Sequence, residues 1–378
     1  MRDFQYWDKQ FKQGNMSSFN DDPHGLLWLK IKSIVRKDLI ARFAKHADLA
    51  IGQLTLSGAF LTLFQELSAD ITASQEGLDG FIRSVSTEQV AATDTERLVS
   101  ELYKLRHFDW GGDYQNSLDK FLVSRYVKTD DPSFERLLSK FDTEINPAVQ
   151  GYVLSSWYNY WSSVLIENIF KSHSAVLPTV GKVKSVDFFL HGIPFDLKVT
   201  YFPSEYLAIQ RKARGYPVER TFLKQQARSL GITYDKNATP DTIEYTIREK
   251  MRDRSDAMSK SALATIREQN ISVLSDAMSN PLPLSKWLYE NQGEMRFGSE
   301  NRIYLILVDM DDFESSWRLK RNVDLLRPTI VGFLDSLSVE ALRNKKVEFV
   351  FKGKAGTFSA LAEVVFVVAG GEGFNRGR

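Results

Sequence analysis

The residues best suited to chemistry lie in the segment 185–200, where two short apolar runs meet at His191-Gly192. A two-residue hairpin loop requires positive φ at both of its positions, and this sequence suits such a loop. The antiparallel register that the loop fixes places Asp187 opposite Asp196. Residues opposed in this way have Cβ atoms roughly 4.5–5.5 Å apart, and like charges there are destabilising. Something must therefore compensate two neighbouring carboxylates.

Two kinds of compensation are open to this pair. Side chains alternate between the faces of a strand, so Lys198 shares the face of Asp196 and offsets part of the charge. Converging carboxylate oxygens are also the hard ligands that Mg²⁺ prefers. The set predicts metal-assisted hydrolysis of a phosphodiester, with Mg²⁺, or Mn²⁺ in its place, as cofactor and Lys198 positioning or deprotonating the attacking water. The alternative is a solvated strand face that happens to hold two Asp and one Lys.

The elements that position these residues follow from hydrophobic periodicity. A long helix begins at Asn146-Pro147 and should end near Ser172, with one apolar stripe along it. The stripe consists of Tyr158, Trp161, Val164, Leu165 and Ile169. Three short strands follow over 175–203, and the reverse face of the hairpin is apolar and should be buried. The run RIYLILVDMDD predicts a central strand, and KKVEFVFKG and AEVVFVV predict further strands.

The periodicity also predicts the domain organisation. Residues 1–145 read as a helical N-terminal domain, suited to DNA recognition or dimerisation. Residues 146–370 form the predicted core, interrupted by a charged helical insertion at about 203–300. The fold class predicted is α/β, with a mixed sheet of the α+β kind.

On these residues the sequence resembles the PD-(D/E)xK nuclease superfamily, which includes most type II restriction endonucleases. Val186-Asp187 matches the first element of the motif and Asp196-Leu197-Lys198 the second, in the order helix, three strands, helix, strand. The resemblance implies a restriction-endonuclease-like core, metal ligation by Asp187 and Asp196, and a catalytic role for Lys198. The chain departs from the motif at Val186, where the signature proline would stand.

The resemblance further implies a glutamate on the preceding helix that faces the metal. Here it would be Glu167, about 130° round the helix from the centre of the apolar stripe, so it lies at the margin of that stripe. An ordinary solvent-facing glutamate is the alternative.

The function implied is a Mg²⁺-dependent endonuclease of double-stranded DNA, in restriction or other anti-phage defence. A DNA-repair or mobile-element nuclease and an inactive DNA-binding module are the alternatives. Symmetric cutting of two antiparallel strands calls for a homodimer.

A basic, glutamine-bearing run directly after the second motif strand predicts DNA contacts, although a solvated helix face explains it equally well. Its predicted DNA-binding residues are Gln210, Arg211, Lys212, Arg214, Arg220, Lys224, Gln225 and Arg228.

Composition limits the other possibilities. The formal net charge is +1, so any nucleic-acid signal must be regional, and the absence of cysteine excludes thiolate metal sites and suits the cytoplasm. No apolar segment reaches the length of a confident membrane span, and no glycine-rich phosphate loop is present, so we expect neither membrane nor nucleotide partners. Asp309, Asp311 and Asp312 predict a capped strand end, with an accessory role in the nuclease or a transferase metal site as the alternatives.

Overall fold

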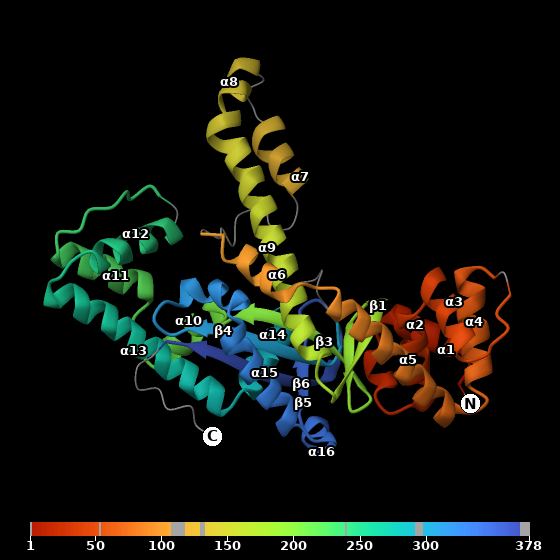
Figure 1. Cartoon of the computed structure of the whole chain (residues 1–378). Helices are drawn as coiled ribbons and strands as arrows, with labels where there is room; N and C mark the ends of the chain where they lie inside the picture. The colour runs from red at the N-terminus through yellow and green to blue at the C-terminus, as the bar shows by residue number, and fades with distance from the viewer. Residues whose placement is uncertain are drawn as a thin grey trace.

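A six-stranded mixed sheet forms the centre of the molecule in the computed structural model, with strand order β1-β2-β3-β4-β6-β5 (Figure 1). The structure describes residues 2–52, 54–106, 118–128, 133–238, 240–291 and 298–370. The strands are β1 (Val176–Val183), β2 (Val186–Leu190), β3 (Ile193–Tyr201), β4 (Arg302–Asp309), β5 (Lys346–Val350) and β6 (Thr357–Ala369). β1, β2 and β3 pair antiparallel, β3, β4 and β6 run parallel, and β5 pairs antiparallel with β6. The predicted α/β class with a mixed sheet is confirmed.

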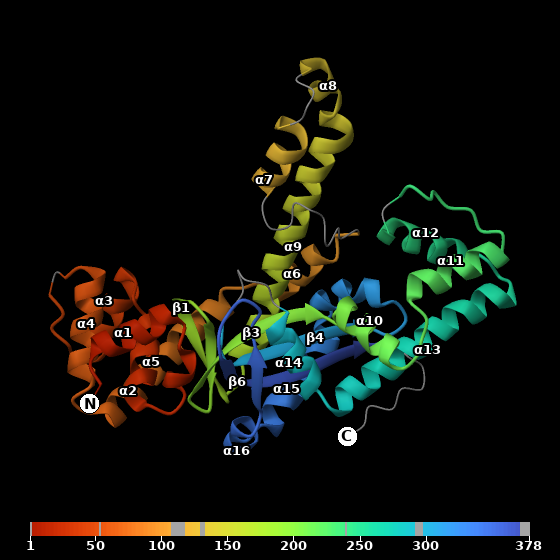
Figure 2. The same cartoon turned by 180° about the vertical axis from the view of Figure 1, so that it is seen from behind.

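Helical segments precede the sheet, as the periodicity predicts. They are α1 (Phe4–Gln13), η1 (Met16–Phe19), α2 (Pro23–Ser33), α3 (Lys37–His46), α4 (Leu56–Leu67), α5 (Ile71–Ala91), α6 (Thr95–Leu102), α7 (Leu118–Leu122), η2 (Val123–Val127), α8 (Phe134–Ser139), η3 (Phe141–Ile145) and α9 (Asn146–Lys171). The first five α-helices lie together beside β1, whereas α9 projects away from the sheet with α7 and α8 near its outer end (Figures 1 and 2).

The segment between β3 and β4 is helical, and the remaining helices follow β4. The first group consists of α10 (Ser204–Ala213), α11 (Glu219–Ser229), α12 (Pro240–Arg252), α13 (Ala257–Ser279) and α14 (Leu282–Glu290). The second consists of η5 (Phe313–Arg321), α15 (Val323–Ser336) and α16 (Val339–Arg343). α11 and α12 lie on the opposite side of the sheet from the N-terminal helices (Figure 1).

Each face of the sheet is covered by helices. On one face, α9 and α15 pack against the apolar side chains of the hairpin and of β4, including Phe188, Phe195 and Leu197. On the other, α13 and α14 cover β4, β5 and β6, and α2 and α5 pack against β1. The face of β3 that bears the predicted catalytic residues lies between these two covered regions.

The apolar stripe of α9 is only partly packed. Ile169 is buried against the sheet, whereas Tyr158 and Leu165 are buried against α6 and Trp317 of η5. Trp161 is exposed, so its assignment to the buried stripe is wrong. Tyr158, one turn nearer the outer end of α9, stays buried against Trp317, so hydrophobic periodicity grouped residues of which only some meet a neighbouring element.

Candidate active site

The hairpin forms as the sequence predicts. His191 and Gly192 have φ of 48° and 81°, so the two-residue loop has positive φ at both positions. The register follows from this loop, with Phe188 opposite Phe195. The reverse face of the hairpin is buried against α9. Local sequence therefore fixes which strand positions face each other, and it carries Asp187 towards β3.

The backbone pairing of β2 with β3 ends next to Asp187. At this point the Asp187 side chain, and not the backbone of β2, accepts a hydrogen bond from β3. The paired positions end at Phe188 and Phe195. One residue further, the backbone N–H of Leu197 donates to Asp187 Oδ2 at 2.7 Å, and the Thr179 hydroxyl donates to the Asp187 carbonyl at 3.0 Å. Both the backbone and the carboxylate of Asp187 are thereby held.

Asp196 lies between two cations. It is 7% exposed, and Lys198 Nζ lies 2.8 Å from each of its carboxylate oxygens. On the neighbouring strand β4, Arg302 pairs in register with Asp196 and places Nε 3.3 Å from Asp196 Oδ2. Lys198 itself is about half exposed, so the site opens to solvent on its side.

The pKa of Asp187 shows that its carboxylate is less well compensated. Burial first, and then the charge of Asp196, raise this pKa from 3.8 to about 6, while the hydrogen bond from Leu197 and the charge of Lys198 act in the opposite direction. A raised carboxylate pKa in a charged cluster is a feature of functional sites.

Glu167 contributes charge to the site from α9. Its negative charge adds to the effects that raise the pKa of Asp187, so it lies within electrostatic reach of that carboxylate. Its side chain forms an ion pair with Lys171, one turn further along the helix, at 2.9 Å. The structure therefore places Glu167 near the pair but holds it to Lys171.

The oxygen ligands suit Mg²⁺ in kind. Asp187, Asp196 and Glu167 supply only hard carboxylate oxygens, and the raised pKa of Asp187 marks negative charge that a divalent cation would relieve. Within the described ranges, no three Asp, Glu, His or Cys side chains come close enough together to enclose a metal as they stand.

Buried polar residues at the start of β4 are functional candidates that the sequence analysis missed. Glu300, Asn301 and Arg302 contact the hairpin, and all three are buried. The available signal was the polar triplet Glu-Asn-Arg directly ahead of an apolar strand.

Several side chains of the basic run after β3 are buried within the helical insertion or paired with residues of it. Arg211 is only 3% exposed, and its guanidinium donates to Asn270 Oδ1 at 2.5 Å and to Gln269 Oε1 at 2.7 Å. Its assignment to DNA contact is therefore wrong for this structure, because tertiary packing buries it between α10 and α13. Arg214 likewise binds Gln210 Oε1 and pairs with Asp276.

The remaining members of the run divide between pairing and exposure. Arg220 pairs with Glu244 at 2.6 Å. Lys212, Gln225 and Arg228 are exposed and Lys224 is half-buried, so these four stay candidates for DNA contact.

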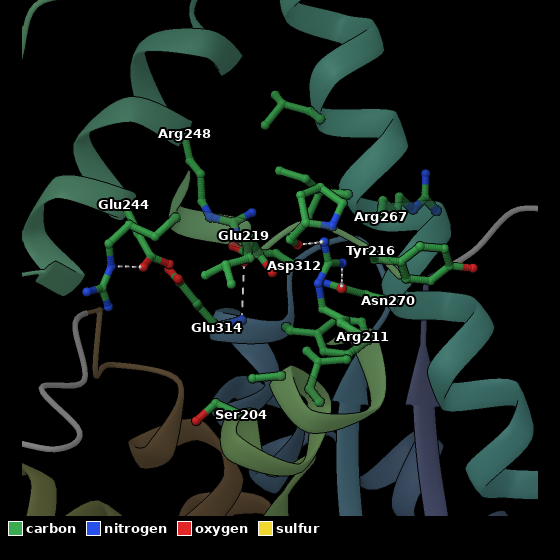
Figure 3. A pocket seen from close by; sticks show the side chains of 18 of the residues that line it. Ser204, Arg211, Tyr216, Glu219, Glu244, Arg248, Arg267, Asn270, Asp312 and Glu314 are labelled. Carbon is green, nitrogen blue, oxygen red and sulfur yellow. Dashed lines mark hydrogen bonds and ion pairs between the residues drawn. The ribbon is translucent and has the colours of Figure 1, made fainter. Parts of the chain in front are cut away.

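A cavity of 710 Å³ lies beside this run, between α10–α13 and the loop after β4 (Figure 3). Its basic side chains face acidic ones across it, since Arg248 pairs with Glu219 and Arg252 with Asp312. The cavity wall therefore carries charges of both signs, several of them paired with each other.

The acidic strand end after β4 is a turn, as predicted. Asp309 Oδ1 accepts from the backbone N–H groups of Asp311 and Asp312, at 3.0 and 3.3 Å, and Asp312 caps η5 by accepting from Glu314 N. These carboxylates are occupied in local structure.

A search of the described residues for membrane-spanning helices and three comparisons with known proteins gave no match. In the described residues, no helix combines the length and apolarity that crossing a membrane requires. No protein-family model, no curated protein and no solved structure matches the chain, so no family is shown for it.

Proposed function

We propose that the chain is a Mg²⁺-dependent endonuclease that hydrolyses phosphodiester bonds of double-stranded DNA, as a restriction or other anti-phage defence enzyme. One observation carries the proposal: two carboxylates and one amine, Asp187, Asp196 and Lys198, gather on one face of a sheet whose reverse face is buried, with Lys198 reaching solvent.

The arrangement of the elements supports a restriction-endonuclease-like core. α9 is followed by the antiparallel strands β1–β3, then by helices, and then by β4 parallel to β3. This is the order that the resemblance to the PD-(D/E)xK superfamily implies. A hairpin alone would not place β4 beside Asp196, so the parallel pairing strengthens the proposal.

Asp187 and Asp196 would hold the metal, with Glu167 as a further oxygen ligand once it leaves Lys171. A bound Mg²⁺ supplies charge neutralisation at the phosphate and a more acidic water. Lys198, half exposed beside Asp196, orients the attacking water or accepts its proton. The water oxygen, having given up a proton, forms a new bond to phosphorus as the bond to one bridging oxygen breaks, and the departing oxygen takes a proton from solvent.

DNA would approach from the solvent side of Lys198. The exposed or half-buried members of the basic run, Lys212, Lys224, Gln225 and Arg228, supply phosphate and base-edge contacts. Because duplex strands are antiparallel, a homodimer with a two-fold axis would present one site to each strand.

Plasmid cleavage with Mg²⁺ tests the proposal. Wild-type protein should give discrete fragments, and Asp196→Ala and Lys198→Ala should each abolish them. Asp8→Ala and Lys12→Ala are matched controls, because these residues form a similar ion pair, of 2.6 Å, on α1. Cleavage that survives both site variants would refute the site, and wild-type binding without cleavage would refute the enzyme.

A further inference from the structure

Three consecutive polar residues are buried where β4 begins, directly beside the candidate site. Glu300, Asn301 and Arg302 are 7%, 2% and 5% exposed. Buried polar and charged groups are destabilising unless they are hydrogen-bonded or paired. Some of their partners belong to the hairpin that carries the two candidate carboxylates, and others include Asn20, Tyr289 and Leu361.

Asn301 clamps the backbone of β3 on the N-terminal side of the site. Its carbonyl accepts the backbone N–H of Asp196 at 2.9 Å, and its Nδ2 donates to the Pro194 carbonyl at 3.0 Å. A shift of Asp196 along the strand would break both hydrogen bonds.

Arg302 joins two carboxylates. Its Nε lies 3.3 Å from Asp196 Oδ2, its Nη2 lies 3.0 Å from Glu300 Oε2, and its guanidinium stacks 5.2 Å from the ring centre of Tyr289. A planar guanidinium can serve two acceptors from a fixed position, which the single ammonium of a lysine cannot reproduce.

Glu300 extends the connection to β2. Its Oε1 accepts the Ser185 hydroxyl at 2.6 Å, and Ser185 lies two residues before Asp187. Gly298 leaves the room for this carboxylate, because a Cβ there would lie 2.0 Å from Glu300 Oε2. One continuous chain of polar contacts therefore runs from the start of β2 through Glu300 and Arg302 to Asp196.

We propose that Glu300, Asn301 and Arg302 form a positioning element, which sets the separation of the Asp187 and Asp196 carboxylates for divalent metal binding. This inference rests on the proposed nuclease function and names the residues that make its metal site competent. The three residues act through the hairpin and are not themselves metal ligands. Partners that orient metal ligands typically alter metal affinity or activity about 10–100-fold when removed.

The test measures Mn²⁺ binding by calorimetry and plasmid cleavage with Mg²⁺ for Arg302→Met, Arg302→Lys and Ser185→Ala. Arg321→Met is the matched control, because Arg321 is also buried and donates to backbone carbonyls of Leu102 and Leu105, in a different part of the molecule. Circular dichroism reports whether each variant is folded.

We expect Arg302→Met to weaken Mn²⁺ binding and to slow cleavage by about 10–100-fold. Arg302→Lys should recover part of the loss, Ser185→Ala should show a smaller one, and Arg321→Met should lower stability without changing Mn²⁺ affinity. Wild-type affinity and rate in Arg302→Met and Ser185→Ala would overturn the positioning role alone. If Arg302→Met does not fold, the Mn²⁺ affinity and cleavage rate of Ser185→Ala decide whether the three residues have a positioning role. Absence of metal binding and cleavage in the wild type would overturn the nuclease and, with it, this role.

A separate observation concerns the part of the molecule that projects from the sheet. The name α9 arm is used for η2, α8, η3 and residues 146–161 of α9. These elements project from the sheet (Figure 2), although Tyr158 among them is buried against Trp317. Within α8, which the structure describes in full, no side chain is buried. The exposed apolar residues of the α9 arm are Val123, Val127, Phe134, Leu138, Phe141, Val153, Leu154, Tyr160 and Trp161.

These residues follow helical stripes. Phe134, Leu138 and Phe141 are spaced four and three residues apart, and on α9 the pairs Val153 with Tyr160 and Leu154 with Trp161 are each seven apart. Phe134 and Tyr160 are 67% and 63% exposed. Stripes of this spacing suit packing against further helices.

The exposed area indicates what covers the arm. At roughly 150–250 Å² for an aromatic side chain and roughly 100 Å² for an aliphatic one, nine side chains about half exposed present on the order of 700 Å² of apolar surface. Monomers rarely expose contiguous apolar patches larger than a few hundred Å², and one partner in a standard interface contributes about 800 Å². We propose that the α9 arm packs against the α9 arm of a second copy of this chain, forming a homodimer.

Sedimentation equilibrium tests this interface with Phe134→Lys and Tyr160→Lys. Tyr245→Lys is the matched control, since Tyr245 is 55% exposed on α12, outside the arm. We expect the wild type and Tyr245→Lys to be dimers, and both arm variants to dissociate at least tenfold more readily. A monomeric wild type, or a dimer that both arm variants leave intact, would overturn the proposal. A monomer whose DNA affinity falls in the arm variants would assign the surface to DNA instead.

Discussion

Asp187→Asn should make the protein more stable while abolishing its activity. Asparagine keeps the size of the side chain and an oxygen that can accept from Leu197 N–H, but it removes the charge that burial and Asp196 disfavour. The pKa of Asp187 rises from 3.8 to about 6 in the folded chain. A rise of about two units corresponds to a difference of about 3 kcal/mol in the free energy of unfolding.

The sign of the pH dependence follows from the direction of this shift. Between pH 3.8 and about 6 the folded chain binds more protons at Asp187 than the unfolded chain does. The contribution of Asp187 to the free energy of unfolding therefore falls as pH rises through this window and stays low above it. Asp187→Asn does not lose stability in this way. Its free energy of unfolding should therefore equal that of the wild type below about pH 4, exceed it increasingly towards pH 6, and exceed it by a constant amount above pH 6.

Urea unfolding in EDTA at pH 4, 5, 6 and 7.5 measures this difference directly. Asp253→Asn, at an exposed carboxylate in the insertion, is the control and should change little at any pH. Adding Mg²⁺ in place of EDTA should stabilise the wild type, because ligand binding favours the folded state, and should have far less effect on Asp187→Asn. An equal or lower stability of Asp187→Asn at pH 7.5 in EDTA, or a difference that does not vary with pH, would refute the reasoning.

Three further results are expected. Glu167→Gln should lower the pKa of Asp187, because it removes a negative charge that raises it, and carboxyl ¹³C NMR titration would show no change if Glu167 lay out of reach. Gly192→Ala should cost about 1–2 kcal/mol in urea unfolding through its φ of 81°, since no atom would contact the added Cβ, and an unchanged stability would contradict this. Burial lowers the pKa of Lys320 to about 8, so the free energy of unfolding of the wild type should increase as pH rises from 8 to 10.5. Lys320→Met should lack this increase, although it also removes the hydrogen bond from Lys320 to Asn159. The same pH dependence in both proteins would contradict this prediction.

Sequence reasoning succeeded where the determining contacts are local. His191 and Gly192 set the loop and the loop sets the register, which ends at Phe188 and Phe195; Asp187 and Asp196 follow it directly and lie within electrostatic reach of each other. It failed for Arg211, because a basic residue on a charged helix looks the same in sequence whether it meets solvent or the amide side chain of Asn270.

The residues that contact Asp196 from β4 also could not be predicted, because they are distant in sequence. Arg302 reaches Asp196 only through the parallel pairing of β3 with β4, and the insertion separates these strands in the chain. Periodicity predicted a central strand at this position but could not state which strand lies beside it. The domain boundaries and the DNA-binding role of the exposed basic residues stay predictions.

The parallel pairing of β3 with β4 also imposes an order of assembly on the site. Asp187, Asp196 and Lys198 leave the ribosome about 100 residues before Arg302, an interval of roughly 5–20 s at ordinary rates of synthesis. During that time the hairpin can form, since its closure is local, but β4 cannot yet lie beside it. The carboxylate pair thus acquires its buried cation only after the insertion has been made, so a nascent or truncated chain holds Asp187 and Asp196 without Arg302 beside them.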